Sequence, residues 1–375
     1  MAKLSETIRL LSDLVAIPSM NPMGRDRTGP EYREERIAAY VADTLRSRGL
    51  DVEMSEVAPG RPNVTAFLDA HRDRTLLLEA HLDTVHAEAM EIAPFDPVVR
   101  EGKLFGRGAC DTKASLAVFI RAICEWAGKK PRYNILLAAV ADEEYRFTGA
   151  KHLAAGGLRA DFGIAGEPTL LQIVRAHKGV TRWKIVTEGK AAHSAYPERG
   201  SNAIYRMGRV LERLETYAGG LERLSRHPLL GTPTLSVGVI EGGQAVNIVP
   251  DRCAIEIDRR TLPGETAAHV LGPVREALRG IDSCRLEEPH LSVEGMDVPE
   301  GAEIVQVLSD GIRAVTGASQ VVSAQYATDA GIYNAAGVPT VVFGPGDIAR
   351  AHTSNEFVEL SQVEQAEAII RAILT

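Results

Sequence analysis

The chain has 375 residues, of which 45% are hydrophobic and 25% charged, and its formal net charge is −8 at pH 7. These proportions are those of an ordinary globular protein, and the length is sufficient for two domains with buried cores. The acidic balance provides no basic surface for a nucleic acid or an anionic membrane, so we expect neither as a partner.

The N-terminal segment has the pattern of a packed amphipathic helix rather than of a secretion signal. Ile8, Leu11, Leu14 and Val15 recur at helical spacing among charged residues. No apolar run approaches the length of a membrane span, and the four cysteines have no CxxC spacing. We therefore expect a soluble, cytoplasmic protein with reduced thiols.

A second helix is expected over Glu31–Arg48, and short apolar runs typical of strands buried on both faces follow it. Helical patterns such as Ala114–Trp126 lie between these runs. Strands that alternate with helices predict an α/β fold with a mainly parallel sheet covered by helices. The runs are Thr75–Ala80, Asn134–Ala141, Asp161–Ala165 and Pro339–Phe343.

The stretch from Ala176 to His290 has a different pattern, in which strands and helices follow the order β-α-β-β-α-β of the ferredoxin-like motif. We therefore predict a larger α/β domain made of residues 1–175 and 291–375, with a smaller ferredoxin-like domain, 176–290, inserted into it. The expected elements are a strand around 183–187, a helix over 201–224, strands over 234–240 and 253–259, a helix over 265–278 and a strand over 283–293.

Histidines and acidic residues follow the predicted strands where each strand ends. In an open parallel sheet, ligands bind outside the carboxyl ends of the strands, so we expect these side chains to meet at one rim. Taken singly, each would be explained as a satisfied core residue or a solvated turn, and it is their convergence that favours a site. The candidate metal ligands are His81, Asp111, Glu144, Glu167 and His352.

Two imidazoles and three carboxylates suit zinc, with Co²⁺ or Mn²⁺ as alternatives, and one carboxylate can be shared between two ions. Asp83 lies on the same strand face as His81, and we expect it to hydrogen-bond the second imidazole nitrogen and fix the tautomer. Glu143, beside Glu144, is the candidate general base, because burial and a neighbouring like charge raise a carboxyl pKa toward neutrality.

Five segments, in order along the chain, resemble the M20 metallopeptidase family. The resemblance implies two zinc ions bridged by Asp111, with His81 and Glu167 on one ion and Glu144 and His352 on the other. It also implies that Glu143 is the general base. Where the family often has Asp-Met-Lys-Gly, this chain has Asp111-Thr112-Lys113-Ala114. The segments are His81-Leu82-Asp83, Gly106-Arg107-Gly108 with Asp111-Thr112-Lys113, Glu143-Glu144, Gly166-Glu167-Pro168-Thr169 and Ala351-His352-Thr353.

The inserted domain carries further resemblances to the family, whose lid domain forms homodimers. His193, in Gly189–Ser194, resembles a histidine that reaches the partner subunit's active site and stabilises the oxyanion. Asn247 lies in a segment that resembles a substrate-contacting loop, and with Arg260 it would anchor the substrate carboxylate. Alternation along the strand favours Arg260, although a shift of one residue would select Arg259.

The resemblance implies an amidohydrolase that acts on a small N-acyl amino acid or peptide. Deacylases and carboxypeptidases of the family tend to carry Glu at the position of Glu167, and its aminopeptidases tend to carry Asp. We therefore expect deacylation, as in the acetylornithine deacetylase and succinyl-diaminopimelate desuccinylase branch. The alternatives are a di- or carboxypeptidase of the same family, or a non-catalytic binding protein that retains the fold.

Overall fold

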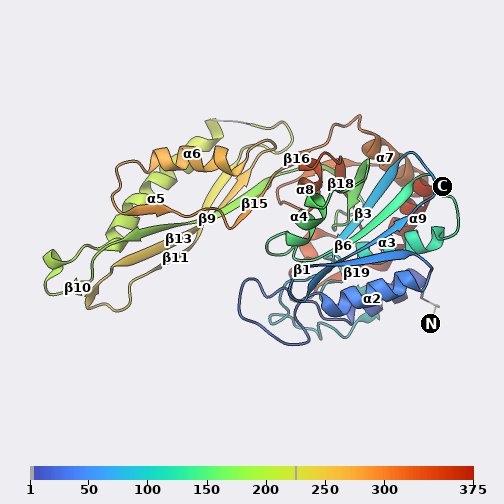
Figure 1. Cartoon of the computed structure of the whole chain (residues 1–375), viewed down its shortest axis with the longest axis horizontal. Coiled ribbons are helices and arrows are strands. Elements are labelled where there is room, and N and C mark those ends of the chain that lie inside the picture. Colours follow the sequence, from blue (N-terminus) through green and yellow to red (C-terminus); the bar gives the residue numbers. More distant parts are fainter. Residues whose placement is uncertain (1–3, 224–225) are drawn as a thin grey trace. The chain divides into compact units, whose positions relative to one another are not determined.

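The computed structural model describes residues 4–223 and 226–375, and the chain folds into two compact units (Figure 1). The first unit comprises Met1–Arg175, Val298–Val322 and Thr328–Thr375, and the second comprises Ala176–Asp297 and Ser323–Ala327. The second unit thus extends beyond the expected boundary at residue 290. The assignment of an inserted lid domain stays a prediction.

The main sheet has, within the described residues, nine strands in the order β1-β2-β6-β3-β7-β18-β8-β16, with β17 beside β8. Its strands belong to the first unit, except for β16 and the last residues of β8 and β17, which belong to the second. The four central strands, β6-β3-β7-β18, are parallel, and antiparallel pairs extend the sheet on both sides. The strands are β1 (Asp51–Ala58), β2 (Arg61–Leu68), β3 (Thr75–His81), β6 (Asn134–Val140), β7 (Phe162–Ala165), β8 (Ile173–His177), β16 (Met296–Asp297), β17 (Val321–Ala324) and β18 (Thr340–Val342).

The predicted α/β class is confirmed, and the parallel arrangement holds where the apolar runs predicted it. β6, β3 and β7 are buried along almost their whole length, because helices cover both faces of the sheet centre. The flanking strand β1 is largely exposed. A fully apolar run in the sequence thus predicts a central strand, whereas an edge strand such as β1 lacks such a run.

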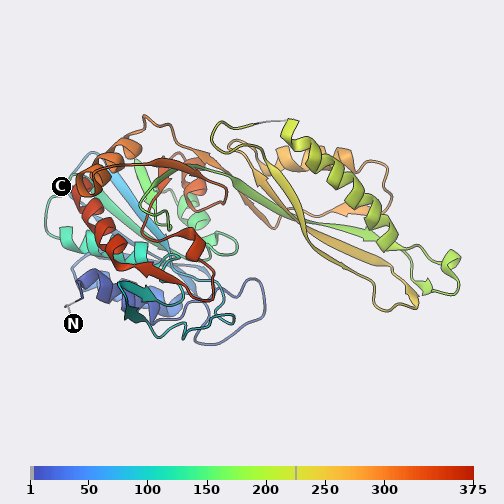
Figure 2. The same ribbon diagram turned by 180° about the vertical axis from the view of Figure 1, so that it is seen from behind.

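Helices cover the two faces of this sheet. On one face, α3 packs on β3 and against α1 and α9, and α9 packs on α7 (Figure 2). On the other face, Ala150 of α4 and Tyr333 of α8 pack on Leu77 of β3. α2 packs on β1 and β2. The helices are α1 (Glu6–Val15), α2 (Glu35–Arg46), α3 (Lys113–Trp126), α4 (Thr148–Ala155), α7 (Glu303–Thr316), α8 (Ala330–Ala335) and α9 (Leu360–Leu374).

A small antiparallel sheet brings the segment after residue 352 next to the loop that precedes α3. Its strands are β4 (Val98–Arg100), β5 (Lys103–Phe105) and β19 (Phe357–Glu359), in the order β19-β5-β4. A short 3-10 helix, η3 (Ile348–Arg350), precedes β19 in the chain. Within residues 4–223 and 226–375, no helix is long and apolar enough to span a bilayer.

The second unit has the β-α-β-β-α-β order expected from the sequence, with the strand order β11-β13-β9-β14 and β15 also paired to β9. Its core includes Trp183, Ile255, Val210 and Val274. The predicted helix end at Leu224 lies outside the described residues. The elements are β9 (Gly179–Glu188), β10 (Ala192–His193), η1 (Pro197–Arg199), α5 (Ala203–Gly220), η2 (Leu221–Arg223), β11 (Thr234–Gly242), β12 (Ile248–Val249), β13 (Arg252–Thr261), α6 (Ala267–Ala277), β14 (Cys284–Leu286) and β15 (Leu291–Val293).

Candidate active site

The parallel strands of the first unit bring the five candidate ligands to one rim. His81 ends β3, and Glu144 and Glu167 follow β6 and β7, which flank β3 in the sheet. Asp111 lies just before α3, and His352 follows η3. The strands end side by side, so residues that are distant in the sequence become neighbours at their carboxyl ends.

Asp111 lies between the two histidines. Its Oδ1 is 3.0 Å from Nε2 of His81, and its Oδ2 is 3.2 Å from Nε2 of His352. Only 8% of the Asp111 side chain is exposed, and 1% of that of His81, whereas 53% of the His352 side chain is exposed. One carboxylate therefore faces an imidazole on each side, which is the arrangement expected of a bridging ligand.

Glu144 lies beside His352, and Glu167 lies beside His81. Oε2 of Glu144 is 3.1 Å from Nε2 of His352, and Oε1 of Glu167 is 3.7 Å from Nε2 of His81. Within the described residues, two groups of potential donor atoms lie close enough to hold a metal ion. They are His81, Asp111 and Glu144, and His81, Glu143 and Glu167.

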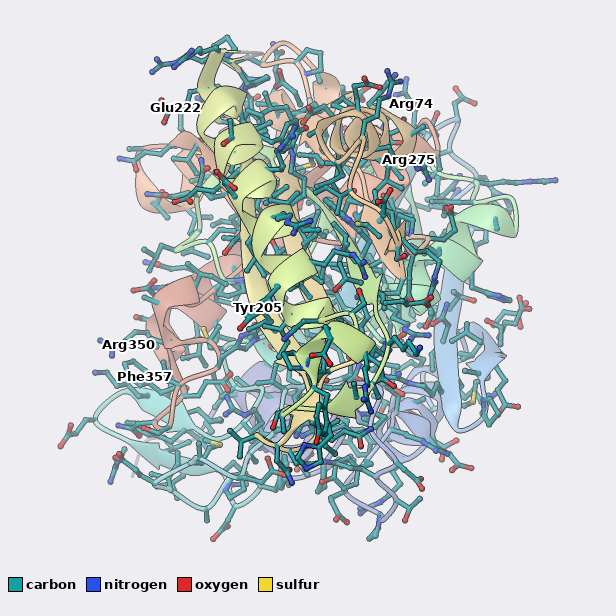
Figure 3. All side chains as sticks on the ribbon, turned by 90° about the vertical axis from the view of Figure 1, so that its left-hand side faces the viewer. Arg74, Tyr205, Glu222, Arg275, Arg350 and Phe357 are labelled. Carbon is teal, nitrogen blue, oxygen red and sulfur yellow. The ribbon has the colours of Figure 1, made fainter. Side chains whose placement is uncertain are left out.

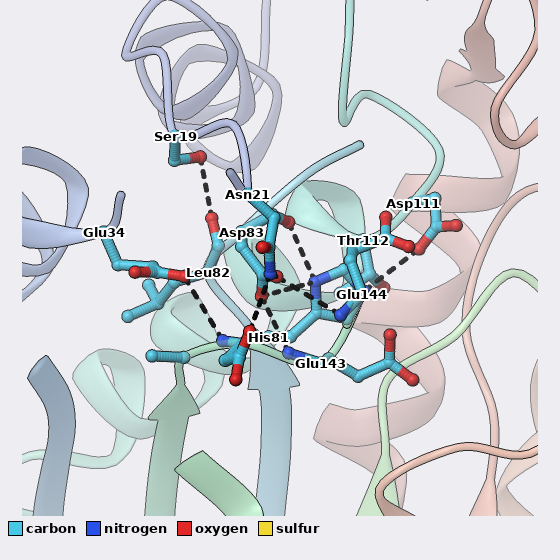
Figure 4. Close-up of polar contacts among 12 residues, drawn as sticks. Ser19, Asn21, Glu34, His81, Leu82, Asp83, Asp111, Thr112, Glu143 and Glu144 are labelled. Atoms are coloured by element: carbon cyan, nitrogen blue, oxygen red, sulfur yellow. Dashed lines mark hydrogen bonds and ion pairs between the residues drawn. The ribbon is translucent and has the colours of Figure 1, made fainter. Parts of the chain in front are cut away.

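The main chain, rather than the Asp83 carboxylate, orients the His81 ring. Nδ1 of His81 is 2.9 Å from the main-chain oxygen of Asp83 and 3.6 Å from its carboxylate, which is beyond hydrogen-bond distance. The carboxylate instead accepts the backbone N–H groups of Glu143 and Glu144, at 3.1 and 3.2 Å (Figure 4). Asp83 thus fixes the turn that carries both glutamates, a contact that the sequence pattern did not predict.

A buried polar network behind Asp83 contains residues that sequence reasoning missed. Asn21 donates to the carboxylates of Asp83 and Asp142, at 2.7 and 2.9 Å. Arg61 donates to Asp142 at 2.6 Å and to Glu34 at 2.9 Å. Asn21 lies outside the five segments that resemble the family, and Arg61 and Glu34 lie 27 residues apart and leave no spacing signal.

The imidazoles and carboxylates shift one another's pKa. Burial alone would raise the pKa of Asp111, but hydrogen bonds from His352 and His81 outweigh burial and hold that pKa below its usual range. The bond to Asp111, followed by that to Glu144, raises the pKa of His352 to about 11. These anionic and cationic side chains thus stabilise one another in a site where Asp111 and Glu144 are buried and His352 is about half exposed.

Within the described residues, Glu144 lies at hydrogen-bond distance from a histidine, whereas Glu143 does not. Burial, and next the negative charge of Glu167, raise the pKa of Glu143 well above its usual range. The charge of Glu144, the neighbour singled out from the sequence, acts in the same direction but has a smaller effect than that of Glu167. A buried carboxyl with a raised pKa can accept a proton near neutrality.

His193 and Asn247 lie together in the second unit. His193 on β10 pairs with Ile248 on β12, and the next residue, Ser194, donates its backbone N–H to the main-chain oxygen of Asn247 at 3.0 Å. Both side chains are exposed. Nδ1 of His193 accepts the N–H of Ala195 at 3.1 Å, so in the neutral ring the proton resides on Nε2, which is then a hydrogen-bond donor.

The register of β13 distinguishes the two candidate arginines. Arg259 faces the core with Ile255 and Ile257, its side chain is 2% exposed, and it pairs with Glu265 at 3.2 Å. Arg260 faces the other way, is 30% exposed, and donates from Nε to Asp258 at 2.7 Å. Arg260 is therefore the arginine available to a ligand.

Arg260 and the His193–Asn247 pair lie at opposite ends of the second unit. Arg252 at the start of β13 pairs with Glu188, close to β10, whereas Thr261 at its end pairs with Gly179. At ~3.3 Å per residue, the strand separates the two ends by roughly 25 Å. The expectation that Asn247 and Arg260 anchor one carboxylate is therefore not met within a single chain.

Comparisons with known proteins identify the family of the chain. Residues 77–375 match the model of peptidase family M20/M25/M40. The chain is 35% identical over 356 residues to acetylornithine deacetylase from Myxococcus xanthus, covering 91% of this chain and 89% of the relative.

Two solved structures show the same fold. An M20 family metallo-carboxypeptidase from Sulfolobus solfataricus has a TM-score of 0.81 at 19% identity, covering 99% of this chain and 98% of the other. A dinuclear metal binding peptidase of the M20 family from Bacillus subtilis has a TM-score of 0.69 at 17% identity, covering 98% and 96%. The chain thus belongs to peptidase family M20/M25/M40 and is a hydrolase of amide bonds.

Proposed function

We propose that the protein removes the acyl group from a small N-acyl amino acid, as an enzyme of the acetylornithine deacetylase and desuccinylase type. The observation that carries the proposal is the position of Asp111 between His81 and His352, in a chain 35% identical to an acetylornithine deacetylase. Glu167, which matches the deacylase and carboxypeptidase members, supports the same choice.

The donor set of the cluster fits two zinc ions, with Co²⁺ or Mn²⁺ as alternatives, because imidazole and carboxylate are ligands that these ions share. His81 and Glu167 would hold one ion, and Glu144 and His352 the other. Asp111 would bridge them, since its two oxygens face different histidines. The ions would supply Lewis-acid polarisation of the amide carbonyl and lower the pKa of water.

The chain's own residues would move the proton and bind the substrate. Glu143 takes the proton of the attacking water and passes it to the departing amine nitrogen, a role consistent with its burial and raised pKa. Nε2–H of His193 donates to the oxyanion that develops on the amide carbonyl. The Arg260 guanidinium binds the substrate carboxylate through paired hydrogen bonds.

A second copy of the chain would supply His193. Arg260 and His193 lie at opposite ends of the second unit, so one copy cannot present both to a small substrate. The β10 end of this unit carries exposed apolar side chains, among them Tyr205 on α5, 74% exposed (Figure 3), and Ile240 on β11, 54% exposed. A groove of about 870 Å³ lies beside them, lined by Ile204, Val246 and Ile248 among others. We propose that this surface forms a homodimer interface.

A substrate panel tests the proposal. Purified protein with added Zn²⁺ or Co²⁺ is assayed for the release of free amine from N-acetylornithine, N-succinyl-diaminopimelate, other N-acyl amino acids and dipeptides. The expected result is deacylation of at least one N-acyl amino acid. Cleavage of dipeptides alone would favour the peptidase alternative, and a metal-free, inert protein would favour a non-catalytic binding role. A cytoplasmic location stays a prediction.

A further inference from the structure

Glu356 is a fully buried carboxylate that has no part in the proposed chemistry but holds the loop that carries Asp111. Its Oε1 accepts the backbone N–H groups of Cys110 and Asp111, at 2.9 and 3.0 Å. Its Oε2 accepts the N–H of Gly108 at 3.0 Å and Nη1–H of Arg107 at 2.7 Å. Three backbone donors of one loop and a guanidinium thus converge on a single side chain.

Arg107 connects the same carboxylate to the segment that carries His352. Its Nη2 donates to the main-chain oxygen of Thr353 at 3.3 Å, next to His352, while Nη1 binds Glu356. The main-chain oxygen of Glu356 accepts the N–H of Gly106 at 3.2 Å. Two segments about 250 positions apart in the sequence are therefore joined by one buried ion pair, which we name the Arg107–Glu356 clasp.

The loop conformation around the clasp depends on a glycine. Gly108 has φ +80°, and a Cβ atom there would lie 2.8 Å from the Thr84 side chain. This conformation allows the N–H of Gly108, and those of Cys110 and Asp111 beyond it, to point toward Glu356. The clasp therefore acts on the path of residues 107–111, and through it on the place of the Asp111 carboxylate.

The fold in this region does not depend on the clasp alone. β19, which begins at Phe357, is held independently by antiparallel pairing with β5, and α9 packs on α3 beyond it. Loss of the clasp should therefore loosen the loops that carry Asp111 and His352, while β19 and α9 stay packed in place.

We propose that Arg107 and Glu356 are positioning residues that set the separation of Asp111 and His352, and with it the affinity of the metal centre. The proposal rests on the proposed metal centre. An outer-shell partner of a metal ligand typically contributes about 10–100-fold to metal affinity. The clasp acts on two ligands at once, one of which would be shared by both ions.

The test compares Glu356→Gln with wild type by calorimetric titration of the metal-free protein with Co²⁺ and by the visible absorption of bound Co²⁺. Gln keeps one acceptor oxygen and places an N–H donor against other donors. We expect at least about tenfold weaker binding of one or both equivalents, a changed Co²⁺ spectrum, and a lower kcat with little change in KM. In the metal-free protein, hydrogen exchange of Gly108, Cys110 and Asp111 should accelerate.

A second variant and a control keep the test decisive if Glu356→Gln folds poorly. Arg107→Lys keeps a cation beside Glu356 but lacks the fork that reaches Thr353, so it should also weaken Co²⁺ binding. Glu125→Gln removes the ion pair with Arg371, near the far end of α3, and should change neither affinity nor spectrum.

The outcomes separate the two proposals. A wild type that binds no Co²⁺ would overturn the proposed metal centre. The positioning role of the clasp alone would be overturned by a different result. In that case the wild type binds two equivalents of Co²⁺, and the folded Glu356→Gln and Arg107→Lys variants bind it with unchanged affinity and spectrum.

Discussion

The candidate site residues of the two units differ in how firmly the chain holds them. In the first unit, His81, Asp111 and Glu143 are buried, and each is fixed by contacts with other buried groups. In the second unit, His193 is exposed on a short two-stranded ladder, and Asn247 is exposed immediately before its second strand. The first set is preorganised within one chain, whereas the second is placed where another molecule can reach it.

The largest expected effect of a side chain in the first unit is that of Glu143. Glu143→Gln removes the proton acceptor and keeps the shape, so kcat should fall by about 10²–10⁴-fold while the bound metal is retained. Steady-state rates and metal analysis of the purified variant measure both. Glu53→Gln, on the largely exposed strand β1, is the control. A Glu143→Gln variant as active as wild type would exclude Glu143 as the general base.

The second unit should contribute through a partner copy. His193→Ala removes an oxyanion donor, and kcat should fall by about 10²–10³-fold. If His193 acts across a dimer, mixing His193→Ala with Glu143→Gln under subunit exchange should restore activity to about one quarter of wild type, since half the dimers are mixed and each has one complete site. No recovery in demonstrably mixed dimers would place His193 in its own chain's site.

Arg260 should affect substrate binding more than turnover. Arg260→Ala removes a charged hydrogen-bond donor, so KM should rise by about 10–100-fold. Arg182→Ala is the matched control, because Arg182 donates to the same Asp258 carboxylate at 2.8 Å. Equal KM effects from the two variants would point to the ion pair with Asp258 and away from substrate contact.

The smallest expected effect is one on stability, at His177, which lies outside both sets. Burial lowers the pKa of His177 from 6.5 to about 4. Between those values the unfolded chain binds the proton and the folded chain does not, so the free energy of unfolding should fall as the pH drops from 6.5 to 4, by about 3 kcal/mol.

Urea unfolding of metal-free protein across this pH range measures that effect. His177→Asn should flatten the dependence relative to wild type, whereas His71→Asn, at an exposed position, should not. An unchanged slope in His177→Asn would show that His177 does not titrate in this way.

The comparison of the two units also explains what the sequence could predict. The central strands and the rim of the first unit are local patterns, because an apolar run ends directly in a histidine or an acidic residue. The ferredoxin-like order of the second unit could be predicted because its strands and helices also have local sequence patterns. These patterns identify which residues meet, but not the hydrogen bonds that hold them.

The supporting contacts could not be predicted, because they join residues that have no periodic relation. Glu356 meets Asp111 across 245 positions, and Asn21 meets Asp142 across 121. The bonds from the Glu143 and Glu144 backbone to Asp83 could not be predicted either, because strand alternation gives the side of a residue and not the partner of its side chain. The distance between Arg260 and Asn247 follows from the length and pairing of β13, which become known only from the fold.

The central claim, that two metal ions lie on either side of Asp111, is tested most directly by anomalous diffraction from crystals of the zinc-loaded protein. The account predicts two peaks ~3.5–4 Å apart, one bound by His81 and Glu167 and the other by Glu144 and His352. Crystals of active enzyme with no peak at Asp111, or with zinc bound only elsewhere, would contradict it.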